Sequence, residues 1–279
     1  MAQGTAGGCN SQLQNGMPGL RRRPLSDGRL PGTERAVTMK VRIKFSKYGP
    51  MKFIGHLDVM RYFQKAIRRA GIDIAYSEGF SPHQIMSFAA PLSVGYTSEG
   101  EYFDIELRTP MEEEELQKRL QGVMVEGIDI LKVQNLPESE GNAMASVQAA
   151  SYLAGFRSLS FLPDDWEDRL LAFYKSPTIP VSKKTKRGEK EIDLKESIYR
   201  FEIREIPEKC ALLEAAAGHK GIYMLLNASS GGNIKPSFVM ETFLAAIGVT
   251  LPEYGLVIHR VETYKASETG EIGDWKALI

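Results

Sequence analysis

The sequence predicts an α+β fold of two tandem ferredoxin-like units, each with the element order βαββαβ and its own antiparallel sheet. Short segments in which apolar and polar residues alternate are typical of half-buried strands, and between them apolar residues recur at helical spacing. After a polar segment at 138–147 the same succession begins again. The alternative is one α+β domain with a single larger sheet.

The first unit is predicted over residues 39–137. Its first strand alternates Val41, Ile43 and Phe45 with polar residues, which predicts a half-buried strand with a cationic outer face. An amphipathic helix follows and ends at Gly71. The later elements are expected as strands over 72–76, 87–107 and 128–137 and a helix over 110–123.

The second unit is predicted over residues 148–266 and carries an insertion. Strands are expected over 148–157, 198–206, 221–229 and 256–266, helices over 163–176 and 235–248, and a basic hairpin over 179–196. Residues 138–147 are predicted to be a linker and 267–279 a tail. Residues 1–38 are rich in Gly, Pro and Arg, which predicts a disordered tail, or a start assigned too early because Met39 precedes the first strand.

Composition limits the class of protein. The chain has 279 residues, of which 43% are hydrophobic and 25% charged, as in ordinary globular proteins. It contains no run of about 20 apolar residues that would predict a membrane span. Two cysteines, Cys9 and Cys210, form no disulfide framework. These features predict a protein of the reducing cytoplasm that makes no membrane contact.

A net charge of zero hides two basic segments that could share one face. Residues 40–69 contain nine Lys and Arg residues against the single acid Asp58, and a second run lies at 182–190. Such segments with interleaved aromatic residues favour contact with RNA, whereas solvated charge is the alternative. The predicted phosphate-contacting residues are Lys44, Lys47, Arg61, Lys65, Arg68, Lys183, Lys184, Lys186 and Arg187.

Two loops are further candidates for binding sites. The irregular segment 76–83 offers Tyr76, Ser77, Phe80, Ser81 and His83 to a ligand or partner. The residues Gly231, Gly232 and Asn233 precede the last helix and could dock an anion, although an ordinary helix-entry turn is the plainer interpretation. Neither segment has the spacing of a nucleotide-binding glycine loop.

Histidine chemistry is the third candidate. His56, Asp58 and His83 could act as general acid and base on a ribose hydroxyl, but a capping or turn-stabilising role is the plainer interpretation. No histidine pair has the spacing of metal ligands on a helix, so no metal site is predicted.

Three motifs in order carry a family resemblance over about residues 40–265. They are "RIKFSKYGPMKFIGHLDVMRYFQKAIRRAGIDIAYSEGFSPHQIMSFAAPLSVGYTSEGEYFDIEL", "KKTKRGEKEIDLKE" and "GGNIKPSFVMETFL". The chain resembles the radical-SAM-linked family, whose members lie beside, or fused to, a radical S-adenosylmethionine protein. The resemblance implies such a protein as partner. The chain lacks the CxxxCxxC cluster, so we expect S-adenosylmethionine and an iron-sulfur cluster only on that partner, and no cofactor here.

These observations lead to one functional prediction with two alternatives. We expect a non-catalytic accessory protein that binds tRNA or ribosomal RNA through a basic face and acts with a separately encoded radical enzyme. The first alternative is a protein-interaction subunit that touches no nucleic acid. The second is a metal-independent ribonuclease that uses His56 and His83.

Overall fold

One mixed sheet runs through the computed structural model, which describes residues 38–185, 188–212, 214–266 and 275–279. The predicted N-terminal tail therefore lies outside the described residues, except for Thr38. Residues 37–279 form one compact unit. No helix in the described part of the chain is long and apolar enough to cross a membrane.

The first half follows the predicted order of elements. Its elements are β1 (Met39–Lys47), the short η1 (Gly49–Phe53), α1 (His56–Arg69), β2 (Met86–Phe88), β3 (Thr97–Leu107), α2 (Glu113–Gln121) and β4 (Ile130–Asn135). The predicted strand over 72–76 is reduced to two isolated bridges, Ile74 with Leu107 and Tyr76 with Gln84.

The second half contains the predicted helices, strands and hairpin. They are β5 (Val147–Phe156), α4 (Trp166–Lys175), β6 (Pro180–Thr185), β7 (Gly188–Asp193), β8 (Ile198–Glu205), β9 (Lys220–Asn227), α5 (Pro236–Ala246) and β10 (Leu256–Ala266). Two short helices were not predicted: α3 (Ala143–Ser146) lies in the segment predicted to be a linker, and η2 (Leu194–Ser197) follows β7. A last strand, β11 (Trp275–Ala277), pairs with β10 in the segment predicted to be a tail.

Apart from β6 and β7, which form a two-stranded sheet of their own, the strands of both halves belong to one nine-stranded sheet. This corrects the prediction of a separate sheet for each half. The order of the nine-stranded sheet is β4-β1-β3-β10-β5-β9-β8, with β2 paired to β3 and β11 to β10. Every pair is antiparallel except β3 with β10, which joins the halves through two parallel residue pairs. Gly100 permits this junction, because a Cβ there would lie 2.5 Å from Glu262 Cα.

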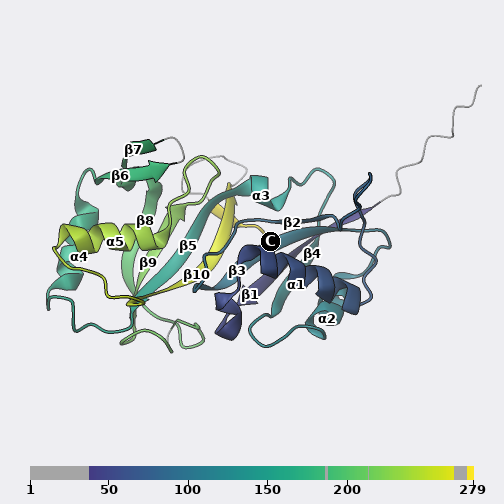
Figure 1. Cartoon of the computed structure of the whole chain (residues 1–279), viewed down its shortest axis with the longest axis horizontal. Helices are drawn as coiled ribbons and strands as arrows, with labels where there is room; N and C mark the ends of the chain where they lie inside the picture. Colours follow the sequence, from purple (N-terminus) through teal and green to yellow (C-terminus); the bar gives the residue numbers. More distant parts are fainter. Residues whose placement is uncertain (1–37, 186–187, 213, 267–274) are drawn as a thin grey trace, which may run out of the picture. The chain divides into compact units, whose positions relative to one another are not determined.

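Each half has its own helices and apolar core. In Figure 1, α1 and α2 lie against the strands of the first half, and α4 and α5 against those of the second. The first core includes Phe45, Phe63 and Phe103, and the second includes Phe201 and Phe243. Arg42 of the first half forms hydrogen bonds with residues that lie outside this half, Glu140, Gly141 and Leu278.

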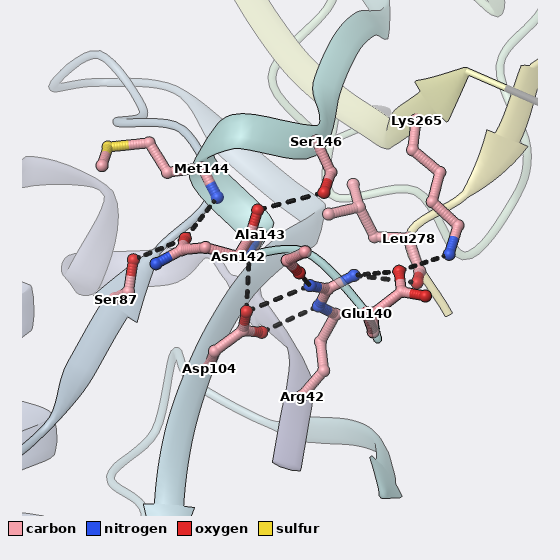
Figure 2. Close-up of polar contacts among 11 residues, drawn as sticks. Arg42, Ser87, Asp104, Glu140, Asn142, Ala143, Met144, Ser146, Lys265 and Leu278 are labelled. Atoms are coloured by element: carbon pink, nitrogen blue, oxygen red, sulfur yellow. Dashed lines mark hydrogen bonds and ion pairs between the residues drawn. The ribbon is translucent and has the colours of Figure 1, made fainter. Parts of the chain in front are cut away.

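A buried arginine of the first half forms hydrogen bonds with segments that follow this half in the sequence (Figure 2). Arg42 of β1 has no exposed surface, and its Nε and Nη2 donate to the two carboxylate oxygens of Asp104 at 2.7 and 3.0 Å. Its other donors reach Glu140 Oε1 and the carbonyl oxygens of Gly141 and Leu278. The sequence predicted that the cationic face of β1 points to solvent, but at Arg42 this face is buried inside the protein.

Candidate nucleic-acid interface

The outer surface of α1 carries four exposed basic side chains, Arg61, Lys65, Arg68 and Arg69. We call the first three the α1 stripe, because Arg69 Nη2 donates to the carbonyl oxygen of Val123 at 3.2 Å. The stripe forms because their spacing of four and three residues places them on one side of a helix, while Phe63 and Ile67 are buried on the other. Among the described residues, the only ion pair of the stripe joins Arg61 Nη1 to Asp58 Oδ1 at 3.4 Å, with side chains 70% and 63% exposed. Solvent screens such a pair, so the three cations remain available.

The loop over residues 76–83, here the Phe80 loop, is closed at its neck. Ser77 N donates to His83 O at 2.8 Å, His83 N donates to Ser77 Oγ at 3.1 Å, and Ser77 Oγ lies 2.7 Å from His83 Nδ1. His83 is thus a structural residue of the neck. Ser81 and Phe80 lie in the exposed tip, where the ring of Phe80 is fully exposed.

An aromatic ring held wholly in water contributes nothing to the core of the protein. Phe80 is fully exposed and Tyr76, at the base of the same loop, is 45% exposed. Rings presented in this way are typical of surfaces that stack on bases or dock a partner.

The Phe80 loop is anchored beside the α1 stripe. Gln84, which follows the loop, is buried, and its Nε2 donates to the carbonyl oxygen of Gln64 in α1 at 3.4 Å. Gln64 directly precedes Lys65 of the stripe. The loop base and the basic face of α1 are therefore neighbours.

Two of the predicted phosphate-contacting residues point into the protein. Lys44 Nζ lies 2.6 Å from Glu262 Oε2. Lys47 is 2% exposed, its Nζ donates to Ile54 O at 2.9 Å, and burial lowers its pKa. Both lie on β1, which has a strand on either side, so these lysines do not belong to the exposed basic surface of the protein.

The basic hairpin lies apart from the α1 stripe. The backbones of Lys183 and Lys184 pair with β7, whereas Lys186 and Arg187 lie outside the described residues. Figure 1 shows β6 and β7 in the second half of the chain and α1 in the first half. That both basic segments share one face stays a prediction, and a ligand that touched both would have to span the two halves.

The three candidate catalytic residues are not gathered into one site. His56 begins α1, its ring meets Phe88 edge-on at 5.4 Å between centroids, and burial lowers its pKa. Asp58 pairs with Arg61, and His83 closes the loop neck. Among the described contacts, none joins His56 to His83.

Packing explains why a glycine occupies position 232 in the turn before α5. A Cβ on Gly232 would lie 2.6 Å from Asn227 Nδ2, and Asn227 Oδ1 accepts hydrogen bonds from Ser229 N and Oγ at 2.9 and 2.7 Å. Gly232 thus makes room for the side chain that shapes the turn. Anion docking at Gly231, Gly232 and Asn233 stays a prediction.

A charged cluster that sequence reasoning missed lies where β3 meets β10. It consists of Lys47, His56, Glu101, Tyr152 and Arg260, and we call it the seam cluster. Strand register puts Lys47 of β1, Arg260 of β10 and Tyr152 of β5 at one level across the sheet. Arg260 Nη1 donates to Glu101 Oε1 at 2.9 Å, and Nη2 donates to Tyr152 OH at 3.3 Å. An arginine inside the apolar run "LVIHRV" was the signal available for it.

A pocket of about 460 Å³ was also missed, because its walls come from four separated segments. Phe156 and Trp166 meet edge-on at 5.7 Å between centroids, and Glu167 pairs with Lys220 at 3.1 Å. The pocket lies where β5 and β9 diverge, beyond their last residue pair, Ala154 with Ile222. In the part of the chain that the structure describes, no group of His, Cys, Asp and Glu side chains is arranged to hold a metal ion.

Comparison with known proteins places the chain in a family. The family model described as an uncharacterized protein conserved in bacteria (DUF2344) matches residues 40–236. Since this match spans well over half of the chain, the protein belongs to that family. No curated protein matches the chain. The description of the family names no radical enzyme, so that link stays a prediction.

Proposed function

We propose that the protein binds RNA, either tRNA or ribosomal RNA, on the α1 stripe and the Phe80 loop, and presents it to a separately encoded radical S-adenosylmethionine enzyme. The observation that carries the RNA part is the fully exposed ring of Phe80 beside three exposed cations. The partnership with the enzyme rests on the family resemblance of the sequence.

The chemistry of this surface suits a single strand or a loop of RNA. Arg61, Lys65 and Arg68 supply positive charge along one side of α1 for successive phosphates, and each contact releases condensed counterions. Phe80 supplies a flat apolar face for a base, and such stacking tolerates any sequence. Together they support affinity for the backbone and bases without sequence readout.

We also infer that the fold is a pair of ferredoxin-like units fused edge to edge. The pairings of β4, β1, β3 and β2 in the first half correspond to those of β10, β5, β9 and β8 in the second, and all of them are antiparallel. An alternating sheet of this order with two helices supports the βαββαβ interpretation of each half.

The charge contribution is tested by the triple variant R61Q/K65Q/R68Q. Binding of bulk tRNA is measured by filter retention at several salt concentrations. We expect the slope of log affinity against log salt to decrease by about 2, because each lost phosphate contact contributes roughly 0.7 for single strands. The control R157Q/R169Q/K209Q removes the same charge from exposed positions of the second half. Equal slopes for the two triple variants would overturn the proposed surface.

The stacking contribution is tested by Phe80→Ala. We expect RNA affinity to fall by about 1–3 kcal/mol, as for other base-stacking rings, with no change in the salt slope. The control is Tyr254→Ala, which removes a ring that is 79% exposed in the second half. An unchanged affinity in the Phe80 variant would remove the stacking role.

The partnership is tested by purifying the protein from its own cells together with whatever it binds. Recovery of a radical S-adenosylmethionine protein with RNA supports the proposal. Recovery of the enzyme in a complex that contains no RNA, and that is lost in the α1 triple variant, would show instead that the stripe docks an acidic protein surface.

A further inference from the structure

The seam cluster contains more buried positive charge than negative charge. Lys47 is 2% exposed and Arg260 is 5% exposed, while Glu101, 5% exposed, is the one carboxylate that acts on both. A protein interior tolerates a cation when an anion compensates it, and an unpaired buried charge costs several kcal/mol. Two cations that share one carboxylate leave a single positive charge without a partner.

The cluster also contains hydrogen-bond donors that have no acceptor among the described residues. Arg260 Nε is buried and has no hydrogen-bond partner among the described residues, although its Nη atoms are bonded to Glu101, Tyr152 and the carbonyls of Ala90 and Pro91. Lys47 Nζ has three hydrogens, and among the described residues it has one acceptor, the carbonyl oxygen of Ile54. The donors point to an acceptor that the chain itself does not supply.

The amino end of α1 borders this cluster. The helix begins at His56, and its N-cap Gly55 has no side chain to bond the free amides of the first turn. His56 is half-buried, and both Glu101 and Lys47 act on its ring. A helix of 14 residues presents partial positive charge at this end, which adds to the charge of Lys47 and Arg260.

We propose that the seam cluster binds one phosphate group, held by Lys47, Arg260 and the amino end of α1, with His56 at its solvent side. A phosphate offers a dianion and several acceptor oxygens, which matches one uncompensated charge and several unused N–H groups. The group is either inorganic phosphate or the terminal phosphate of an oligonucleotide. This inference does not rest on RNA binding by the α1 stripe, because none of its residues belongs to the stripe.

The test measures binding of inorganic phosphate by isothermal titration calorimetry to the full chain and to Lys47→Met. Met keeps the length of the side chain and leaves Arg260 paired with Glu101, so the fold is expected to persist, and circular dichroism checks it. We expect the wild type to bind phosphate and Lys47→Met to bind it about tenfold or more weakly, since a buried charged donor is lost. Lys65→Met, which removes an exposed lysine of α1, serves as the matched control and keeps wild-type affinity.

Two further arms sharpen the result. Glu101→Gln removes the competing carboxylate and is expected to bind phosphate more tightly, which a general loss of structure would not produce. Oligonucleotides with a 5′-phosphate or a 5′-hydroxyl group distinguish inorganic phosphate from the end of a nucleic acid as the ligand. If the protein prefers the 5′-phosphate and Lys47→Met abolishes this preference, the ligand is a nucleic-acid end. Binding of inorganic phosphate without such a preference identifies free phosphate as the ligand.

The proposal is overturned if two results occur together. The wild-type protein does not bind inorganic phosphate, and it binds the oligonucleotide with a 5′-phosphate no more tightly than the one with a 5′-hydroxyl group. The proposal is equally overturned if Lys47→Met and Lys65→Met weaken phosphate binding to the same extent. Bulk tRNA binding through the α1 stripe can succeed or fail separately, since its variants leave the seam cluster intact.

Discussion

The strand β1 and the helix α1 are both rich in basic residues, yet the fold uses them in opposite ways. Arg42 and Lys44 of β1 lie inside the sheet, each against a carboxylate from another strand. Arg61 and Lys65 of α1 face solvent. The difference teaches that position in the sheet, rather than basic composition, decides whether a cation stabilises the fold or remains free for a ligand.

The cause of this difference is the place of each element in the fold. β1 is an inner strand with β3 and β4 on either side. A buried cation there needs a carboxylate near it, and Asp104 and Glu262 fulfil this need. α1 buries one side against the core, so its other side requires no partner.

The largest expected effect is on Arg42. Replacing it by Met should destabilise the protein by about 3–5 kcal/mol, because the carboxylate of Asp104 would remain largely buried without its cation. Urea unfolding followed by circular dichroism measures this change. The double variant R42M/D104N should recover part of the loss, since it removes the stranded charge. A loss below 1 kcal/mol for Arg42→Met would mean that the buried network does not support the fold.

The sequence predicted the order of elements well because alternation and helical spacing are local signals. Phe63 and Ile67 reveal the buried side of α1, and the exposed stripe is simply the other side of the same helix. The burial and ion pairing of Arg42 and Lys44 were not predictable in this way. Their partners Asp104 and Glu262 lie 62 and 218 residues away, and only the strand pairing brings them together.

The joining of the sheets and the seam cluster were missed for the same reason. The sequence around Gly100 gives no sign of a strand junction, whereas in the structure this glycine permits the close approach of β10 to β3. Glu101 and Arg260 then meet across that junction, 159 residues apart. Contacts that depend on which strands become neighbours leave no periodic pattern in either segment alone.

A smaller effect is expected for Lys44, whose pair with Glu262 is only partly buried, with side chains 20% and 14% exposed. Lys44→Met should destabilise the protein by about 1 kcal/mol, between the values for buried and exposed pairs. Tyr102 OH also donates to Glu262, so the carboxylate keeps one partner. Chemical denaturation at low and high salt measures the loss. A loss as large as that of Arg42→Met would show that Tyr102 does not compensate.

The pH dependence of stability is expected to report on Lys47. Burial lowers its pKa in the folded protein below the ordinary value of 10.5, so between these two values the unfolded chain binds more protons. The contribution of Lys47 to stability therefore increases as pH rises through that interval. The wild type minus Lys47→Met difference in unfolding free energy, measured from pH 7 to 10.5, isolates this contribution from other titrating groups. A difference that stays constant with pH, or falls, would contradict a buried, desolvated ammonium.

The smallest effect on stability is expected for the α1 stripe. The variant R61Q/K65Q/R68Q should change the free energy of unfolding by no more than about 0.5 kcal/mol, because exposed charges with screened partners contribute little. Glutamine preserves helix propensity, so the helix itself is not weakened. Thermal and urea unfolding measure the change beside Arg42→Met under identical conditions. A loss above 1 kcal/mol would mean that the stripe makes stabilising contacts within the protein, and its cations would then not be free for RNA.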